Sequence, residues 1–392
     1  MVLESDDPMM NLTRKCPLCL NTTGNLLGTV TYALFDDSPL QRESRVVACA
    51  RCGFVFYDTE NSQKAYDDFY KNHYYMSYYK TDSRVLEDYF GVAADIIRGL
   101  DLPRGVRICD IGCGNGELLE QLRKRGFSNL CGVDYHLPRN AFAEKGIEAI
   151  EGSTEELPVT DNSVGMFLFS QVFEHLLEPS STVEKIRDKL SPNGLVYLEV
   201  PDTERYALYL HYDPLNLFII EHINHFDLYH LHELFVRKGF SVVTSGKRVR
   251  GSGEFFPVPV IYTVVRNGGN GSAKPVPLPD FALAKRITSW FQTPGEYLKE
   301  LLSRELYIWG ISYKTMLALE REPLKDCRVK AFLDSNPEKH KKKINGIPIS
   351  SPEILKKATA DSIVCIAQCP SALTMYSILH DEYGYKGECL ML

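Results

Sequence analysis

Long hydrophobic runs are missing from this sequence: none of its 392 residues belongs to a segment apolar enough, over enough length, to span a membrane. The first residues, MVLESDDPMM, are acidic and lack the basic start of a secretion signal. A surplus of basic residues is missing too, since the formal net charge is -7, which disfavours a partner bound mainly through phosphates. We therefore expect a cytoplasmic chain that has no membrane partner and does not depend on nucleic acid.

The eleven cysteines are expected to stay reduced or to bind metal, because no secretion signal accompanies them. Four of them form two C-x-x-C pairs separated by 29 residues, and these are Cys16, Cys19, Cys49 and Cys52. Two such pairs together offer a closed tetrahedron of thiolates, and strand-like runs lie between and after them, as in a zinc ribbon. We predict structural zinc, with four unrelated cysteines as the alternative. Cys365 and Cys369 have no second pair and are expected to be core thiols.

The stretch from Val106 to Tyr135 has the pattern of a nucleotide-binding βαβ unit. A short apolar run ends at Asp110, and three glycines follow at alternate positions, namely Gly112, Gly114 and Gly116. Glycine lets the backbone turn tightly and lets a ligand lie against the main chain. A helical pattern then leads to a second strand ending in Asp134, where a carboxylate accepts hydrogen bonds from ribose hydroxyls.

The loop has the spacing D-x-G-x-G-x-G, which differs from the G-x-G-x-x-G of dinucleotide sites. A carboxylate at Asp110 would repel a pyrophosphate but suits a ligand with a positive amino group. Through residues 110–116 and Asp134 the sequence resembles the class I S-adenosylmethionine-dependent methyltransferases. The resemblance implies an α/β fold with a Rossmann-like doubly wound sheet, and S-adenosylmethionine as cofactor. The alternative, a glycine turn without a ligand, leaves both acids unexplained.

Later turns of the same expected sheet supply further candidates for cofactor contacts. The resemblance places two of them in the turn that contacts adenine and two at the end of the fourth strand, and these are Ser153, Thr154, Ser170 and Gln171. Gly165 stands where the family commonly has aspartate. Glu174-His175 matches the family's Glu-His element, and His175 is either a proton acceptor or a packing histidine.

A candidate acid/base set lies just before a predicted helix that Asp227 caps. Its members are Glu221, His222 and His225. Histidine titrates near neutrality, and a nearby carboxylate raises and orients its basicity. A second metal site and plain capping and packing stay open as alternatives. Upstream, the tyrosine-dense segment Tyr66 to Lys80 is either an amphipathic linker or a lid over a substrate.

Changes of composition divide the chain into four parts. We predict a zinc-binding module over residues 11–65, a methyltransferase core with the tyrosine-rich lid over 66–265, a linker with helices over 266–303, and a second α/β unit over 304–392. In the last unit one strand ends at Gly310 and another at Asp334. Because Gly310 is the only glycine in its first turn, we expect a degenerate Rossmann-like scaffold without a cofactor of its own, in preference to a second nucleotide site.

The order of these modules resembles the sugar C-methyltransferases, which act on nucleotide-linked 4-keto deoxysugars. The residues that carry the resemblance are the four cysteines, the 110–116 loop, Glu221-His222, the run 331–337 and the run 346–349. It implies an enzyme that removes the proton beside a keto group and methylates that carbon. His222 would be the base, with Glu221 orienting it and a tyrosine from Tyr75 to Tyr79 polarising the enolate oxygen. His225 is the second candidate for the base.

Two features depart from that family, and other functions remain as alternatives. Ile219 stands where the family commonly has tyrosine, and residues 250–254 replace its glycine-serine-arginine segment. An O- or N-methyltransferase on a sugar or other small molecule would need a base but no enolate stabilisation. Of other classes, an enzyme that binds structured RNA through the ribbon is disfavoured by the mixed charges of residues 1–79. A non-catalytic interaction protein is disfavoured by the intact glycine loop.

Overall fold

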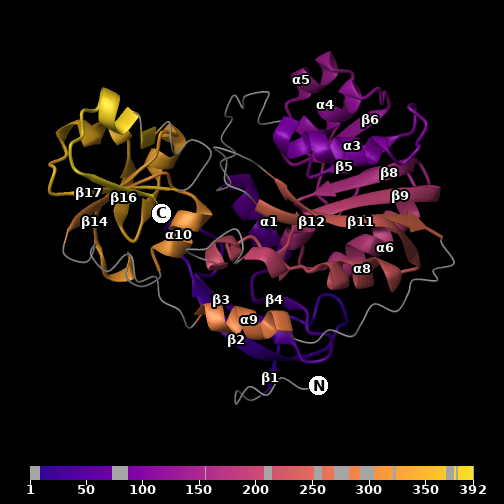
Figure 1. Cartoon of the computed structure of the whole chain (residues 1–392), viewed down its shortest axis with the longest axis horizontal. Coiled ribbons are helices and arrows are strands. Elements are labelled where there is room, and N and C mark those ends of the chain that lie inside the picture. Colours follow the sequence, from indigo (N-terminus) through magenta and orange to yellow (C-terminus); the bar gives the residue numbers. More distant parts are fainter. Residues whose placement is uncertain are drawn as a thin grey trace.

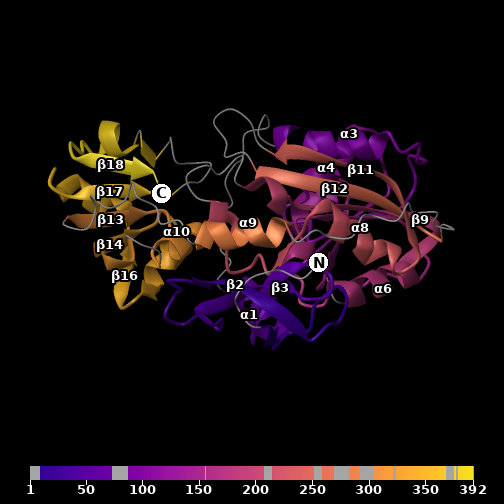
Figure 2. The ribbon, with the colours of Figure 1, turned by 60° about the horizontal axis from the view of Figure 1, so that its bottom comes forward.

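The computed structural model describes residues 9–72, 87–154, 156–206, 214–250, 258–268, 282–291, 304–320, 324–367, 375–376 and 378–391. These residues form a five-stranded, a seven-stranded and a six-stranded sheet. Figure 1 shows the seven-stranded sheet with its helices on the right and the C-terminal unit on the left, and Figure 2 shows the N-terminal sheet below both.

The N-terminal sheet is antiparallel and takes its last strand from a distant part of the chain. Its first four strands are β1 (Met10–Asn11), β2 (Thr23–Thr31), β3 (Glu43–Cys49) and β4 (Val55–Asp58). The fifth, β10 (Asn224–His225), pairs with β4, so that Asn224 lies opposite Phe56 and His225 opposite Val55. The turn that contains Glu221 and His222 therefore runs directly into the cysteine-bearing sheet.

The central sheet has the order β11-β12-β9-β8-β5-β6-β7. Its strands are β5 (Ile108–Ile111), β6 (Leu130–Asp134), β7 (Glu148–Glu151), β8 (Val164–Ser170), β9 (Leu190–Pro201), β11 (Phe240–Arg250) and β12 (Val258–Asn267). All neighbouring pairs are parallel except those of β12, which runs against both β9 and β11. The predicted doubly wound α/β sheet is confirmed, while the hairpin of β11 and β12 was not predicted.

Helices cover both faces of the central sheet, because successive strand residues point to opposite sides. α3 (Val92–Arg98), α4 (Glu117–Lys124) and α5 (Arg139–Glu144) lie on one side, and α6 (Pro179–Lys189) and α8 (Leu228–Val236) on the other (Figure 1). Ile108, Met166 and Leu168 pack under the first group, whereas Cys109, Phe167 and Phe169 pack under the second. Asp227 caps α8 as predicted, because its carboxylate accepts a hydrogen bond from the His230 amide at 2.8 Å.

The C-terminal sheet has the order β15-β16-β14-β13-β17-β18. Its strands are β13 (Glu305–Trp309), β14 (Arg328–Leu333), β15 (Lys343–Ile344), β16 (Ile347–Ser350), β17 (Ile363–Ile366) and β18 (Glu388–Met391), with helix α10 (Tyr313–Ala318) after β13. The two remaining α-helices of the described ranges are α1 (Gln63–Asn72) and α9 (Ala282–Phe291). Among the described residues, none of the helices combines the length and the apolar character needed to cross a bilayer.

One hydrophobic core joins the N-terminal sheet to the C-terminal unit. It contains Val30 and Val46 from the first and Ile308, Phe332 and Ile344 from the second. Backbone hydrogen bonds cross the same boundary, because the Ala33 amide donates to the Met316 carbonyl at 2.9 Å and the Asp36 amide to the Lys343 carbonyl at 3.0 Å. The other face of the N-terminal sheet packs on the central domain through Phe54, which contacts the ring of Phe226.

Candidate functional site

The glycine loop lies between β5 and α4, where the residues of the D-x-G-x-G-x-G motif turn the chain. Gly112, Gly114 and Gly116 have φ values of 69°, 55° and 78°, a left-handed conformation that side chains disfavour. A Cβ atom on Gly116 would lie 2.6 Å from the ring of Phe142, and one on Gly112 would lie 2.8 Å from a methyl group of Val172. The loop therefore has no room for side chains at Gly112 and Gly116.

Two carboxylates lie at the loop, as the sequence predicts. Asp134 ends β6 and accepts a hydrogen bond from the Gly114 amide at 2.9 Å, so it holds the loop against the neighbouring strand. Asp110 is 3% exposed. Burial, and then the charge of Asp134, raise the pKa of the Asp110 carboxyl well above its ordinary value. A positively charged group bound beside Asp110 would offset this cost, which fits the amino group of S-adenosylmethionine.

The other predicted cofactor residues follow the next strands at the same edge of the sheet. Ser153 and Thr154 come after β7, and the Ser153 hydroxyl accepts a hydrogen bond from the Glu156 amide at 3.1 Å. Ser170 ends β8, and Gln171 has a φ of 60°, a strained conformation that is concentrated at functional sites. The structure thus brings these turns to the carboxyl ends of the strands, where ligands of open α/β sheets bind.

The structure also explains the glycine at position 165. A Cβ atom there would lie 2.2 Å from a methyl group of Val106. Because the Val106 side chain fills the space beside β8, an aspartate does not fit at this position unless that side chain moves.

A compact polar cluster forms from two distant segments that no local sequence pattern links. Glu174, His175 and His222 each place one potential ligand atom so that all three atoms lie within 4.8 Å of one another. Nε2 of His175 lies 3.7 Å from a Glu174 carboxylate oxygen, and the rings of His175 and His222 meet edge to face. The Tyr70 hydroxyl lies 2.8 Å from Nδ1 of His175. Tyr70 belongs to the predicted tyrosine-rich segment, yet its local pattern does not distinguish it from its neighbours.

Backbone carbonyls fix both histidines of this cluster. Nδ1 of His175 lies 2.8 Å from the Glu221 carbonyl, and Nδ1 of His222 lies 3.0 Å from the Leu217 carbonyl. A neutral imidazole that donates from Nδ1 carries its lone pair on Nε2. Burial lowers the pKa of His175 to about 4 and, with the charges of His175 and His225, lowers that of His222 well below its ordinary value. Both rings are therefore neutral bases near pH 7.

Two buried carboxyls accompany these histidines. Burial raises the pKa of Glu174 to about 8, and burial together with the charge of Glu174 raises the pKa of Glu221 well above its ordinary value. Both oxygens of Glu174 lack a hydrogen-bond partner among the described residues, and so does Oε2 of Glu221. Such unpaired buried carboxyls are expected at a site that receives a proton or a ligand.

His225 lies apart from the cluster. Its ring stacks on Phe218 at a centroid distance of 4.0 Å and also contacts the ring of Tyr57. Both ring nitrogens are buried without a hydrogen-bond partner in the described parts of the chain, and burial lowers the pKa of His225 to about 3. Its strand pairing and ring stacking give His225 a place in the junction between β10 and the N-terminal sheet. Tyr75 and Tyr79 lie outside the described residues.

Arg250 is a buried charge near the site, which its sequence position, in a departure from the family pattern, did not indicate. Its guanidinium lies over the rings of Tyr89 and Phe90 at 5.3 and 5.0 Å and forms an ion pair of 3.5 Å with Glu199. Burial raises the pKa of both Asp110 and Glu174, and the positive charge of Arg250 offsets part of that rise at each carboxyl.

The four predicted zinc ligands converge at one end of the N-terminal sheet. Their sulfur atoms lie within 4.8 Å of one another, with 3.6 Å between Cys16 and Cys52 and 3.5 Å between Cys19 and Cys49. Zinc–sulfur bonds of about 2.3 Å in a tetrahedron require sulfur atoms about 3.8 Å apart. The Arg51 amide donates to the Cys49 sulfur at 3.4 Å, as is common around metal-bound thiolates. The geometry fits Zn²⁺ without rearrangement of the chain.

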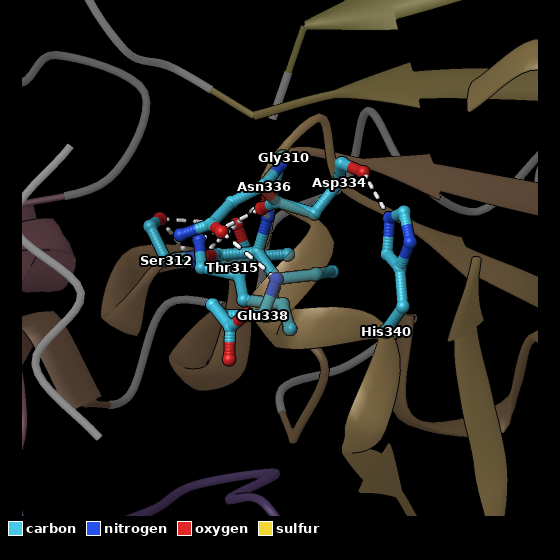
Figure 3. A network of polar contacts seen from close by, with 9 residues as sticks. Gly310, Ser312, Thr315, Asp334, Asn336, Glu338 and His340 are labelled. Atoms are coloured by element: carbon cyan, nitrogen blue, oxygen red, sulfur yellow. Dashed lines mark hydrogen bonds and ion pairs between the residues drawn. The ribbon is translucent and has the colours of Figure 1, made fainter. Parts of the chain in front are cut away.

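In the C-terminal unit, groups of the protein itself form hydrogen bonds in the turn after β13 (Figure 3). Asp334 accepts hydrogen bonds from the Ile311 amide at 3.0 Å and from the Lys339 ammonium group at 2.7 Å. Ser312 and Thr315 form a reciprocal cap at the start of α10. The carboxylate that would meet a ribose in a nucleotide site is thus bound by Lys339.

Comparisons with known proteins agree on the central domain. Residues 85–245 match the family model of a methyltransferase domain. A ubiquinone biosynthesis O-methyltransferase of Neisseria meningitidis serogroup C is 27% identical in an alignment of 125 positions that covers 29% of this chain and 52% of that protein. Another, of Azorhizobium caulinodans, is 30% identical in an alignment of 120 positions that covers 29% of this chain and 46% of that protein. The chain spans about half the length of these curated relatives.

Solved structures of methyltransferases are also similar to the central domain. The structure of an S-adenosylmethionine-dependent methyltransferase from Mesorhizobium loti is 15% identical and covers 45% of this chain and 100% of that one, with a TM-score of 0.36. At this score the likeness carries no functional argument. The matched stretch 85–245 includes the glycine loop, Glu174, His175 and the turn with Glu221 and His222.

Proposed function

We propose that this chain, whose residues 85–245 match a methyltransferase domain, is an S-adenosylmethionine-dependent C-methyltransferase. Its acceptor would be a nucleotide-linked keto-deoxysugar, methylated at the carbon beside the ketone. The observation that carries the proposal is the cluster of Glu174, His175 and His222, which offers neutral bases, and Val172, two residues before Glu174, packs against Gly112 of a glycine loop of the methyltransferase type. The resemblance of the whole module order to sugar C-methyltransferases supports the class of acceptor.

The donor side is formed by the loop between β5 and α4. The main chain of Gly112, Gly114 and Gly116 would lie against the ligand, since these residues carry no side chain. Asp110 would pair with the amino group and Asp134 would meet the ribose hydroxyls, as the family resemblance implies. When bound, S-adenosylmethionine supplies an electrophilic methyl group on a sulfonium, and the carbon of the acceptor enolate takes it.

On the acceptor side, His222 is the proposed base. Its Nδ1 hydrogen is held by the Leu217 carbonyl, so Nε2 can take the proton from the carbon next to the ketone. The electron pair of that C–H bond moves onto the carbonyl, which becomes an enolate. Glu221, the preceding residue, keeps its predicted role of orienting the imidazole. Tyr75 and Tyr79 keep their predicted role of polarising the enolate oxygen, and Tyr70 is the phenol that the structure adds to this site.

Proximity is expected to provide much of the rate, because the methyl group is already activated. The site need only exclude water, hold the acceptor carbon near the glycine loop and move one proton.

The four cysteines are proposed to hold a structural Zn²⁺. All four positions of a tetrahedral ion would be filled by sulfur, so the metal would have no position for an acceptor. Its contribution would be to fold the N-terminal sheet, and through β10 the turn that carries the base.

O-methylation is the second candidate, and the printed names of the similar relatives favour it. Two of them, at 27% and 30% identity, are ubiquinone biosynthesis O-methyltransferases. A hydroxyl acceptor would need the same base and donor loop but no group to stabilise an enolate. The two candidates therefore differ in whether a carbon-bound hydrogen of the acceptor exchanges with solvent.

The test uses the purified chain, labelled methyl donor and a panel of dTDP- and GDP-linked 4-keto sugars in deuterated water. We expect deuterium to enter at the carbon beside the ketone and the label to arrive at the same carbon. The variant His222→Asn should lose about 10²- to 10⁴-fold of both rates, the usual contribution of a general base. Under the same conditions His225→Asn should keep the larger part of both rates.

Three outcomes would redirect the assignment. Donor binding without exchange or transfer on every keto sugar would remove the carbon-acid mechanism and favour a hydroxyl or amine acceptor. Equal losses in the two histidine variants would remove His222 as the particular base. A calorimetric titration in which S-adenosylmethionine does not bind would support a non-catalytic protein.

A further inference from the structure

We propose that Glu174, His175 and His222 form a binding site for a first-row divalent transition-metal cation, separate from the four-cysteine cluster. On sequence grounds a second metal site was an alternative, but on Glu221, His222 and His225. The structure selects a different set, because His225 stacks on Phe218 and is absent from the group of converging ligand atoms.

The potential ligand atoms of the three residues converge. One nitrogen of each histidine and one oxygen of Glu174 lie within 4.8 Å of one another, and Nε2 of His175 is 3.7 Å from the Glu174 oxygen. Metal–ligand bonds of about 2.0–2.1 Å in a tetrahedron require donors about 3.4 Å apart. Small side-chain rotations would therefore complete a coordination shell of two imidazoles and one carboxylate, a set that binds zinc, cobalt and non-haem iron.

The two histidines are held in the way that metal-bound histidines commonly are. Such histidines donate their other ring nitrogen to a backbone carbonyl, which fixes the tautomer and the ring orientation. Here the Glu221 carbonyl lies 2.8 Å from Nδ1 of His175, and the Leu217 carbonyl lies 3.0 Å from Nδ1 of His222. Both rings therefore offer Nε2 as the ligand atom.

The carboxyl group of Glu174 is buried and has no hydrogen-bond partner among the described residues. Both of its oxygens lack a hydrogen-bond partner in the part of the chain that the structure describes, and the side chain is 1% exposed. A bound cation would satisfy this carboxylate and would also be attracted by the nearby Glu221. The positive charge of Lys314, in the C-terminal unit, acts on His222 and would oppose cation binding. The imidazole of His175 is 19% exposed, which gives the ion a path from solvent.

The consequence for catalysis rests on the proposed function. A cation bound to Nε2 of His222 takes the lone pair that would accept the acceptor's proton. Occupancy should therefore inhibit the enzyme, and the inhibition should be overcome when acceptor fills the site first.

The experiment titrates zinc-loaded protein with Co²⁺ and records the visible absorption of the cobalt ion. We expect one equivalent to bind with a d–d spectrum that lacks the near-ultraviolet bands of thiolate-to-cobalt charge transfer, because the new ligands contain no sulfur. Glu174→Gln and His222→Asn should each weaken binding at least tenfold, whereas the matched variant His225→Asn should bind as the unaltered protein does. Transfer assays at low and high acceptor concentration would then show inhibition that acceptor relieves.

The proposal is overturned by a titration with no cobalt bound beyond the cysteine site, or by a spectrum unchanged in both Glu174→Gln and His222→Asn. Thiolate charge-transfer bands alone would assign the bound ion to the cysteines and would overturn it equally. The two proposals can fail separately. Cobalt binding that depends on Glu174, without deuterium exchange at the acceptor carbon, would support the metal site and contradict the carbon-methylation mechanism. Deuterium exchange without cobalt binding would support the mechanism and contradict the metal site.

Discussion

At the scale of single residues, the site depends on positions where one atom more or less changes the geometry. Gly116 is one of these, because its φ of 78° and the ring of Phe142 both exclude a side chain. Gly165 is another, since Val106 occupies the space that a Cβ atom would need. At His222 the decisive atom is the Nδ1 hydrogen, which the Leu217 carbonyl receives. Each of these constraints comes from a neighbour within van der Waals or hydrogen-bond distance.

Substitution of Gly116 tests the donor loop. In Gly116→Ala the left-handed conformation costs about 1–2 kcal/mol, and the new methyl group would lie 2.6 Å from Phe142. We expect the loop to shift and the dissociation constant for S-adenosylmethionine to rise at least tenfold by calorimetric titration. Gly239→Ala is the matched control, because Gly239 has a φ of 85° but no atom within 4 Å of the point that a Cβ atom would occupy. Equal weakening in both variants would mean that general destabilisation, and not the loop, controls binding.

At the scale of secondary structure elements, the two-residue strand β10 connects the proposed zinc site to the proposed base. Cys49 ends β3 and Cys52 lies in the turn between β3 and β4, and β4 pairs with β10. The Tyr57 amide donates to the Ile223 carbonyl at 2.9 Å, one residue after His222. His230, at the start of α8, contacts the Cys52 carbonyl through Nε2 at 2.8 Å. The base turn is therefore held by the sheet that the cysteines close.

Loss of a zinc ligand should consequently affect the acceptor side of the site more than the donor side. In Cys49→Ser we expect zinc content to fall and amide hydrogen exchange at Tyr57 to accelerate, because its partner turn is no longer fixed. Methyl transfer should drop at least tenfold, while the dissociation constant for S-adenosylmethionine changes less than threefold. The control is Cys389→Ser, a cysteine of the C-terminal sheet outside the cluster. Unchanged exchange at Tyr57 in a zinc-free protein would show that the metal does not position the turn.

At the scale of the whole molecule, the N-terminal sheet is the centre of the assembly. One of its faces packs on the central domain through Phe54 and Phe226, and the other shares a core with the C-terminal unit. Arg14 adds a polar connection on the first side, since its guanidinium donates to the Leu176 carbonyl and to the Asn224 side chain, both at 3.1 Å. A change in the C-terminal unit can therefore reach the proposed base through the N-terminal sheet.

Two isoleucines on opposite faces of the C-terminal sheet test this connection. Ile308 lies in the core shared with the N-terminal sheet, and Ile366 lies in the core that the C-terminal unit keeps to itself, and both are fully buried. Each substitution by alanine should lower the free energy of unfolding by about 2–5 kcal/mol. Only Ile308→Ala should speed amide exchange in β2 and β3, because only that side chain supports the N-terminal sheet. Equal exchange in the two variants would mean that the sheets are energetically independent.

The local features of this protein were determined by the sequence itself. Asp110 and the alternating glycines predict their turn, because the left-handed conformation is a property of each residue. The C-x-x-C pairs predict a convergence of thiols, since two cysteines three positions apart share one tight turn. The cap of α8 by Asp227 follows from local pattern in the same way.

The contacts between distant segments were decided only by the tertiary structure. His175 meets Tyr70 across 105 positions of sequence and the Glu221 carbonyl across 46, and no local pattern specifies either partner. β10 is two residues long, too short for any periodicity to reveal it, and it exists because β4 has a free edge beside it. Burial of Glu174 and His222 likewise depends on how three sheets pack together, and that burial gives the cluster its chemistry.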